Sequence, residues 1–356
     1  MRSLLSCKKS RRLALLAICC SIFAVSARSE VGFFPTGVID MLPTSMSHDG
    51  SIVVGTGFYQ VPNLYYTEAA GASVIGDGCS NGLPSISGDG TTVLGCHVNA
   101  QGNENAAKWL GGTSWQDLGS EAGAVPCGNS LSGPFGVNQD GSLAVGLLWR
   151  AQVCKANAGF WDLVNGGPAT VLPSLLDGPA SRANGINDDG SVIIGWQDQL
   201  NGERTAAKWI NGVEEFILTP SGEFNGEALA VSADGNAIVG ANYGLSDDAW
   251  IWRSATGVER INQWRKSLVL LDVSDDGRTA VGFTREGSKK RFQRAFLWRD
   301  GRGPVVLTKY LADRGVVVPE GWNLSVANVI STDGNTVYGW GFNPDNLVEM
   351  FKVELK

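Results

Sequence analysis

The chain is poor in the residues on which most hydrolytic and metal-dependent chemistry depends. Its 356 residues include two histidines, His48 and His97. The sequence contains no Ser-His-Asp order, no His-Glu-x-x-His motif and no glycine-rich phosphate loop. It also lacks the Cys-x-x-Cys and histidine spacing of a zinc site. We therefore assign no catalytic residue, no metal and no cofactor from the sequence, and we expect His48 to be a solvent-facing turn residue.

Positive charge is also scarce. The chain has 28 Lys and Arg residues against 35 Asp and Glu residues, a formal charge of −7 at pH 7. Residues 1–27 hold five of the basic residues and none of the acidic ones, so the remainder carries −12. A chain this acidic has no electrostatic attraction for phosphate backbones or anionic lipid. We therefore expect no nucleic acid among its partners.

Long hydrophobic runs are confined to the first 30 residues. There, a basic head precedes the apolar run Leu13–Ala24 and the small-residue stretch Val25–Ala27. This order is typical of a secretory signal peptide, and the run is too short to cross a bilayer of about 30 Å as a helix. We expect residues 1–27 to be removed. Residues 28–356 would then form a single domain, monomeric, secreted or periplasmic, with no membrane span in the mature chain.

Two alternatives exist for this first segment. An uncleaved signal would anchor the chain in a membrane. A lipoprotein would be processed at Cys19 or Cys20, but Ile18, directly ahead of Cys19, is larger than such processing usually accepts. A cleaved signal peptide is the preferred prediction.

What the sequence has in abundance is a short repeated unit. The unit consists of an apolar residue, Ser or Asn, any residue, Asp-Gly, four mostly apolar or small residues, and Gly. The Asp-Gly pairs begin at Asp49, Asp89, Asp140, Asp189, Asp234, Asp276 and Asp333. Six residues after each Asp stands Gly55, Gly95, Gly146, Gly195, Gly240, Gly282 or Gly339. Self-similarity at about 40–50 residues is typical of propellers and solenoids.

Each unit predicts four strands. Ser or Asn, Asp and Gly favour a tight turn between a first strand and a β-branched second strand, with the Ser or Asn side chain bonding the backbone two residues on. An aromatic third strand follows, most clearly in Ala106–Trp109, Ala158–Trp161, Ala206–Trp209, Ala249–Trp252 and Ala295–Trp298. Short apolar segments, such as 213–217, 257–261 and 305–307, supply the fourth strand. We expect the Trp side chains to fill the space between neighbouring sheets, because each can bury about 200 Å².

Seven such units predict an all-β, seven-bladed β-propeller. The seventh unit stops after its aromatic strand, whereas residues 37–42, ahead of the first Asp-Gly pair, have the pattern of an unpaired fourth strand. If this N-terminal strand completes the last blade, the ring is closed and no open edge remains. An open solenoid would instead need polar capping units at its ends, and the sequence shows none.

Outside the first segment the chain has four cysteines. Cys79 and Cys96 flank the second Asp-Gly hairpin, and Cys127 and Cys154 flank the third. The outer ends of a hairpin come close together, so we predict the disulfides Cys79–Cys96 and Cys127–Cys154. Disulfides persist in oxidising compartments, which agrees with the predicted export.

The repeats resemble the HAF-type extracellular repeats of exported bacterial proteins. That family combines an Asn/Ser-x-Asp-Gly turn, a Val-Gly strand end and an Ala-Phe-x-Trp strand, and the closest unit here joins Ser274–Gly277 to Ala295–Trp298. The chain lacks the His that often precedes Ala-Phe in the family; Arg294 stands there instead. The resemblance implies an extracytoplasmic β-propeller and no particular catalytic chemistry.

The variable loops between second and third strands are the predicted binding surface, because function usually lies on variable loops held by a rigid scaffold. These loops cover residues 56–63, 96–105, 147–157, 196–204, 241–248, 283–294 and 340–346. Their candidate ligand-binding residues are Tyr59, His97, Trp149, Arg150, Trp196, Asp198, Tyr243, Asp247, Arg285, Arg291 and Trp340. The alternative for each is that it packs over the rim or only keeps the loop soluble.

Two functional hypotheses follow. The preferred one is an exported, non-catalytic propeller that binds a protein, peptide or glycan through this variable face. The other is an extracytoplasmic polysaccharide hydrolase or lyase that uses carboxylates from different blades in the central funnel. Buried, converging carboxylates with an arginine in the central pocket would favour the enzyme, and an exposed aromatic and polar face would favour the binding protein.

Overall fold

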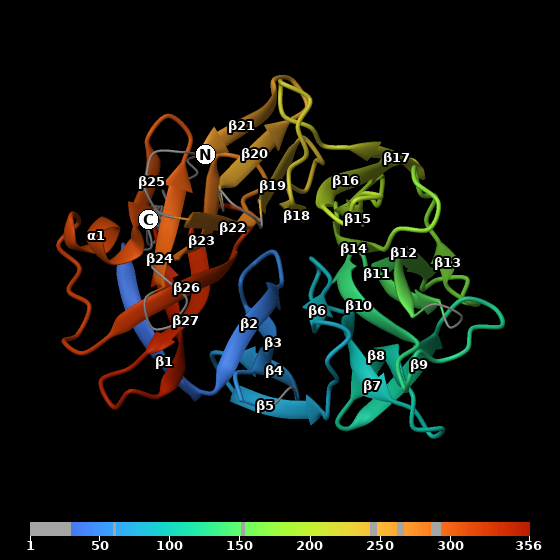
Figure 1. Cartoon of the computed structure of the whole chain (residues 1–356). Helices are drawn as coiled ribbons and strands as arrows, with labels where there is room; N and C mark the ends of the chain where they lie inside the picture. Colours follow the sequence, from blue (N-terminus) through green and yellow to red (C-terminus); the bar gives the residue numbers. More distant parts are fainter. Residues whose placement is uncertain (1–29, 60–61, 151–153, 243–247, 262–266, 286–292) are drawn as a thin grey trace, which may run out of the picture.

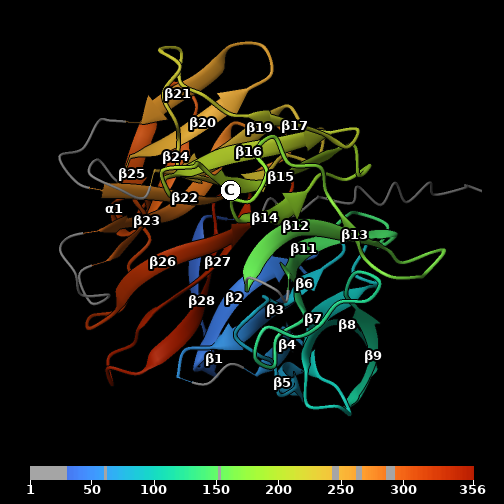
Figure 2. The ribbon, with the colours of Figure 1, turned by 45° about the vertical axis from the view of Figure 1, so that its right-hand side comes forward.

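The computed structural model describes residues 30–59, 62–150, 154–242, 248–261, 267–285 and 293–356. Its strands form seven four-stranded sheets, which are arranged around a common centre like the blades of a propeller (Figure 1). In a second view the sheets again follow one another around the ring in the order of the sequence (Figure 2). The predicted all-β, seven-bladed β-propeller is therefore confirmed.

Blades 1 to 4 contain four consecutive strands each. Blade 1 holds β2 (Met41–Met46), β3 (Ile52–Gly57), β4 (Asn63–Thr67) and β5 (Gly71–Gly76). Blade 2 holds β6 (Ser85–Ile86), β7 (Val93–Val98), β8 (Glu104–Gly111) and β9 (Ser114–Gly119). Blade 3 holds β10 (Ser132–Val137), β11 (Leu143–Arg150), β12 (Lys155–Asp162) and β13 (Thr170–Val171). Blade 4 holds β14 (Ser181–Ile186), β15 (Val192–Asp198), β16 (Arg204–Ile210) and β17 (Val213–Phe216).

Blades 5 and 6 have the same order, and blade 7 differs in one strand. Blade 5 holds β18 (Glu227–Val231), β19 (Ala237–Ala241), β20 (Ala249–Arg253) and β21 (Gly257–Ile261). Blade 6 holds β22 (Ser267–Val273), β23 (Thr279–Arg285), β24 (Arg294–Arg299) and β25 (Gly303–Val306), followed by the helix α1 (Leu307–Ala312). Blade 7 holds β26 (Asn323–Ile330), β27 (Thr336–Phe342) and β28 (Val348–Glu354), with β1 (Gly32–Ile39) as its fourth strand.

The innermost strands contact one another in a cycle. β2 contacts β6, β6 contacts β10, and the contacts continue through β14, β18 and β22 to β26, which contacts β2 again. β1 pairs antiparallel with β28, and Phe33 lies opposite Val353. The blue first strand accordingly lies beside the red strands of blade 7 (Figure 1). This pairing is compatible with the predicted completion of the last blade by an N-terminal strand.

The predicted strand over residues 37–42 is divided in two. Asp40 has a positive φ of 63°, which interrupts an extended strand and which Asp tolerates better than most residues. Its carboxylate accepts the backbone N–H groups of Phe58 (3.0 Å) and Tyr59 (3.2 Å). The residues before Asp40 therefore belong to β1, and those after it begin β2.

The seven Asp-Gly turns share one hydrogen-bond pattern. In blade 5, Ser232 Oγ donates to Asp234 Oδ1 (2.7 Å) and accepts the backbone N–H of Ala237 (3.0 Å). Asp234 Oδ1 also accepts the N–H of Asn236 (2.9 Å), and Gly235 has a φ of 72°. The Ser or Asn side chain thus accepts an N–H five residues ahead in all seven turns, not two ahead as predicted. The two-residue bond is made by Asp.

In six of the seven repeats, the final glycine faces the innermost strand at very short range; Gly95 of blade 2 instead meets the side chains of Asn63 and Trp115. In blade 6 a β-bulge between Leu270 and Asp272 brings the Val269 carbonyl oxygen to 1.9 Å from where a Cβ on Gly282 would lie. Gly55, Gly146, Gly195, Gly240 and Gly339 meet a carbonyl oxygen of the first strand in the same way, at 1.9 to 2.2 Å. Only glycine fits this contact, which explains the fixed position of glycine in the repeat.

The predicted aromatic third strands supply the packing between blades. Trp161, Trp209 and Trp250 are each 2% exposed or less. Trp209, for example, lies in one apolar cluster with Val145 of blade 3 and Ile193 of its own blade. The prediction that the Trp side chains of these strands form core is confirmed for Trp161, Trp209, Trp250 and Trp298, whereas Trp109 and Trp252 are partly buried.

Both predicted disulfides are present. The Cα atoms of Cys79 and Cys96 are 5.4 Å apart, and those of Cys127 and Cys154 are 5.2 Å apart.

Leu307, placed at the end of a predicted strand over 305–307, instead begins α1. No helix in the described ranges has the length and apolar character needed to cross a membrane.

Candidate functional site

The strand order divides the connections of the propeller into two faces. The Asp-Gly face carries the turns between first and second strands and the hairpins between third and fourth strands. The loop face carries the loops between second and third strands and the connections from each fourth strand to the next blade. All four disulfide cysteines lie toward the loop face.

Exposed apolar side chains gather on the loop face. Leu200 and Tyr59 are 81% and 75% exposed, and Val317, between blades 6 and 7, is 83% exposed. The other large apolar side chains exposed on this face are Ile39, Leu83, Val98, Val125, Leu175, Leu218, Phe224 and Leu347. The hairpins of the Asp-Gly face hold three such side chains in the described residues, Leu110, Val164 and Val213, and two more, Phe34 and Val74, lie on the outer strands β1 and β5. The loop face is therefore the more apolar of the two.

Four predicted binding residues are on this face with exposed or partly exposed side chains. Tyr59 is the most exposed, and Arg150 is exposed at the end of β11. His97 is partly buried, and its ring stacks on Trp115 with the ring centroids 6.4 Å apart. Asp198, at the end of β15, forms an ion pair with Arg204, with 3.3 Å between Asp198 Oδ1 and Arg204 Nε.

The three predicted Trp residues are not exposed binding platforms. Trp196 and Trp340 are 5% and 4% exposed, and Trp149 is partly buried. The Arg204 guanidinium covers the Trp196 ring at 3.6 Å, and Trp340 packs on Phe58 at 5.3 Å. The expectation of exposure is wrong because β11, β15 and β27 continue past the repeat glycine. The Trp side chains therefore remain on sheet faces that neighbouring blades cover.

The side chains of the remaining predicted residues lie outside the described part of the structure. Tyr243, Asp247 and Arg291 lie outside the described residues. Arg285 is the last residue of β23 and pairs with Ser267 of β22, but its side chain is outside the described part.

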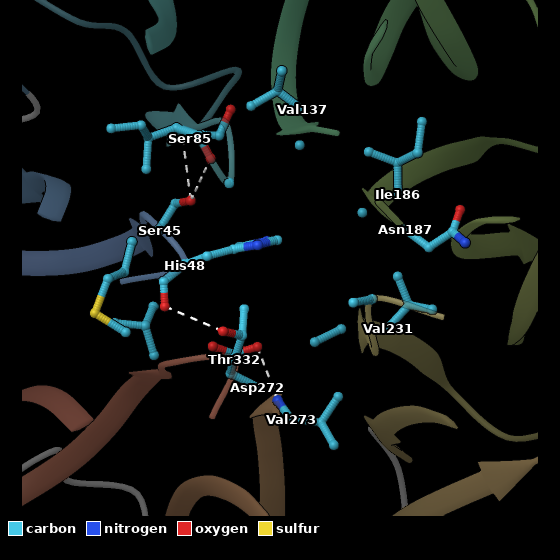
Figure 3. Close-up of a pocket in the computed structure, with 18 of the residues that line it drawn as sticks. Ser45, His48, Ser85, Val137, Ile186, Asn187, Val231, Asp272, Val273 and Thr332 are labelled. Carbon is cyan, nitrogen blue, oxygen red and sulfur yellow. Dashed lines mark hydrogen bonds between the residues drawn. The ribbon is translucent and has the colours of Figure 1, made fainter. Parts of the chain in front are cut away.

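A cavity of about 200 Å³ lies at the centre of the ring, toward the Asp-Gly face (Figure 3). Its wall is built from the innermost strands and from the turns that follow them. The β-bulge of these strands adds one wall residue in six blades: Thr44, Phe135, Asn184, Leu229, Leu271 and Asn328. The β-bulge that brings the innermost strand close to the repeat glycine therefore also adds side chains to the wall of the cavity.

His48 reaches into this cavity. Its Nε2 lies 3.3 Å from Oδ1 of Asp188, which joins blade 1 to blade 4. Figure 3 shows the imidazole pointing across the cavity toward Ile186 and Asn187. The expectation of a solvent-facing turn residue is wrong, because the position between Ser or Asn and Asp faces the propeller axis. The same position holds Asp275 in blade 6, and the repeat alignment was the signal that could have brought these residues together.

Asp272 is a third carboxyl group in the wall. Its oxygens accept the backbone N–H groups of Val273 (2.9 Å) and Ile330 (2.8 Å). Burial raises its pKa to about 7, an effect that these two hydrogen bonds oppose. The cavity is smaller than the roughly 300 Å³ at which ligand pockets usually begin, and no lysine or arginine is among the described residues that line it. Carboxylates do converge here, but the cavity does not offer the space for a sugar chain.

Comparisons with known proteins agree on the fold. No protein-family model and no curated protein matches the chain. Among solved structures, the β-propeller domain of the Trilobed protease from Pyrococcus furiosus is 12% identical, with 89% of this chain and 96% of that chain covered and a TM-score of 0.58. A prolyl endopeptidase structure is 12% identical, with 90% of this chain covered and a TM-score of 0.55.

TolB from Acinetobacter baumannii is 14% identical, with 91% of this chain covered and a TM-score of 0.45. The chain spans 63% of that TolB chain and 49% of the prolyl endopeptidase chain. The two structures with TM-scores of 0.58 and 0.55 show a shared propeller fold, and the function has to be argued from the chain's own surface.

Proposed function

We propose that this protein is an exported, non-catalytic propeller that binds a protein or peptide partner through its loop face. The observation that carries the proposal is the gathering of exposed apolar side chains on that face. Soluble proteins expose large apolar patches chiefly where they bind something. Leu200, Tyr59 and Val317 are the first candidates for contact because they are the most exposed.

The scaffold supports this surface from below. The disulfides Cys79–Cys96 and Cys127–Cys154 link the segments on either side of the Asp-Gly hairpins in blades 2 and 3. The Asp40 carboxylate holds the backbone of Tyr59. A surface that is ordered before binding loses less conformational entropy on association. Trp196 and Trp340 are buried and Trp149 is partly buried. The loop face therefore offers fewer aromatic rings for stacking on a sugar than the sequence predicted, which favours a protein or peptide over a glycan.

Site-specific photo-crosslinking tests this proposal. A benzophenone amino acid is placed at Tyr59, at Leu200 and, as a matched control on the Asp-Gly face, at the 63% exposed Val213. We expect one discrete adduct from positions 59 and 200 in cells that export the protein, and none from position 213. The identified partner must then bind the purified protein, with affinity reduced about tenfold by Leu200→Ser, the loss expected for one apolar anchor. Adducts of equal yield from position 213 would contradict the loop-face assignment.

We also propose that residues 1–27 direct export and that the chain belongs with the HAF-type extracellular repeat proteins. The two disulfides support export because such bonds persist in oxidising compartments. N-terminal sequencing of the exported protein should begin near Arg28. An intact N-terminus on protein retained in the cytoplasm would contradict it.

We further propose that β1 holds the ring closed. Its pairing with β28 covers the outer edge of blade 7, and covering an edge removes unpaired backbone groups. Deletion of residues 30–39 from the exported protein should lower the unfolding temperature and increase self-association. An unchanged unfolding temperature would show that the contact of β26 with β2 closes the ring alone.

A further inference from the structure

Seven residues, one from each turn, frame the cavity mouth on the Asp-Gly face. They stand between Ser or Asn and Asp in the repeats and are His48, Gly88, Gln139, Asp188, Ala233, Asp275 and Thr332. Backbone bonds join neighbouring turns, such as the N–H of Asp188 to the carbonyl of Ala233 (3.2 Å) and the N–H of Asp275 to the carbonyl of Thr332 (3.0 Å). Thr332 Oγ1 donates to the carbonyl of His48 (3.2 Å) across the junction of blades 7 and 1. The main chain therefore fixes the frame.

Acidic groups outnumber basic groups at this mouth. One imidazole, His48, faces the carboxyl groups of Asp188 and Asp275, and Asp272 lies in the wall. Burial raises the pKa of Asp188 and the pKa of Asp275, and His48 opposes both shifts. The neighbouring turn residues Asp189, Asp234 and Asp276 add further negative charge. No lysine or arginine among the described lining residues balances these carboxyl groups.

Two polar side-chain atoms of residues in the wall have no partner among the described residues. Ser85 is 2% exposed, and its Oγ makes no hydrogen bond. The Oδ1 of Asn328 is also buried and unpaired. Both residues line the cavity, and Figure 3 places Ser85 on the opposite side from Asp272 and Thr332. Buried polar atoms are normally satisfied by protein, ordered water or a ligand, so this wall has unused hydrogen-bonding capacity.

A cation that donates hydrogen bonds suits these groups better than a bare metal ion. Within the described residues, no three His, Cys, Asp or Glu side chains are placed to hold a metal. A primary ammonium group carries one positive charge and three N–H donors, which match carboxylate, hydroxyl and amide oxygens. The cavity of about 200 Å³ has room for an unbranched alkyl chain.

We propose that this mouth binds a primary ammonium group on a thin alkyl chain, either a lysine side chain of a partner or a free alkylamine. Asp188 and Asp275, which line the cavity, supply the negative charge and accept the N–H donors of the ammonium group. The seven turn aspartates around the mouth add attraction at longer range. The site lies on the face opposite the proposed partner surface, so the failure of either proposal leaves the other standing.

The two histidines of the chain give a direct readout. The imidazole C–H signals of His48 report on the mouth in NMR spectra, and those of His97, on the loop face, are the internal reference. We expect n-butylammonium to shift the His48 signals saturably and to leave those of His97 unchanged. Tetramethylammonium, which has no N–H donor, and sodium chloride at equal concentration should have no saturable effect. Hexalysine is the probe for a lysine side chain of a partner, and n-butylammonium is the probe for a free alkylamine. The probe that saturates the His48 shift at the lower concentration identifies which of the two the site prefers.

Single carboxylate substitutions complete the test. Asp275→Asn should raise the half-saturating concentration about tenfold, the loss expected for one charge-assisted hydrogen bond. Asp313→Asn, at the C-terminal cap of α1, is the matched control and should leave the half-saturating concentration unchanged. The proposal is overturned if neither amine shifts His48, if sodium chloride shifts it equally, or if Asp275→Asn binds as the unsubstituted protein does. Because the Asp275 side chain makes no hydrogen bond among the described residues, this variant should keep its fold, which its circular dichroism spectrum would verify.

Discussion

The two faces of this propeller differ in what their residues are used for. On the Asp-Gly face, seven near-identical turns satisfy their own polar groups, as in the bonds among Ser232, Asp234 and Ala237. On the loop face the connections differ in length from blade to blade, and they expose apolar side chains such as Leu200 and Tyr59. Repetition therefore marks the groups that stabilise the fold, and variation marks the groups that are available to a partner. Substitutions should cost stability in the first set and binding in the second.

The largest effect is expected where the repeat glycine meets the innermost strand. In Gly282→Ala the new Cβ would lie 1.9 Å from the Val269 carbonyl oxygen, so β22 has to move. We expect a loss of at least about 3 kcal/mol in unfolding free energy, the upper part of the range for overpacking. Gly257→Ala, with a φ of 76° and open space around it, is the control and should cost about 1 kcal/mol. Urea unfolding measures both; equal losses would show that backbone conformation, not the bulge contact, governs the repeat glycine.

Glu214 is an exception among the polar groups of the scaffold. It is 4% exposed in β17, its Oε1 has no partner among the described residues, and its Oε2 accepts the N–H of Leu175. Burial raises its pKa to about 7, an effect that the Leu175 bond opposes. The folded state thus favours the neutral carboxyl group. The contribution of neutral Glu214 to the unfolding free energy is fully present below about pH 4, and it is lost as the pH rises through about 7.

Glu214→Gln removes this penalty. We expect the variant to exceed the unsubstituted protein in unfolding free energy by about 2–3 kcal/mol at pH 8, and by almost nothing at pH 4. Thermal unfolding at several pH values measures the difference. Glu320→Gln, on the exposed connection between blades 6 and 7, should show no such dependence. A gain that is the same at pH 4 and pH 8 would mean that ionisation of Glu214 is not its cause.

The sequence predicted those parts of the structure whose chemistry is local. Each Asp-Gly turn is completed within six residues, so one repeat unit contains all the information that the turn needs. The disulfides were predictable for the same reason, because each flanks a single hairpin. The contact of His48 with Asp188 was not, since it joins blades 1 and 4 and the position it uses accepts His, Gly, Gln, Asp, Ala or Thr.

The burial of Trp196 and Trp340 was also beyond the sequence argument. The predicted loops begin directly after the repeat glycine, but β15 and β27 extend past that glycine. Strand ends depend on pairing with the next strand, here with β16 and β28, and such pairing is not encoded in the strand alone. The lesson is that a turn can be located from its own residues, whereas the limit of a strand depends on its neighbours.

A smaller effect is expected in the turns themselves. Ser232 is 1% exposed, and Ser232→Ala leaves the buried N–H of Ala237 without its acceptor. We expect a loss of about 1–2 kcal/mol in unfolding free energy. Ser232→Asn should restore most of it, because Asn138 and Asn187 accept the equivalent N–H groups in blades 3 and 4. If Asn fails to rescue the turn, the seven turns are less interchangeable than their shared pattern indicates.

The smallest effect on stability, and the sharpest contrast between the faces, is expected at Leu200. With 81% of its side chain exposed, Leu200→Ser should change the unfolding free energy by less than about 0.5 kcal/mol. Yet the same variant should lose the crosslinked adduct formed from position 59. Val213→Ser, on the opposite face, should alter neither quantity. A loss of stability in Leu200→Ser comparable to that of Ser232→Ala would mean that the loop face also stabilises the fold, and the division between the two faces would then fail.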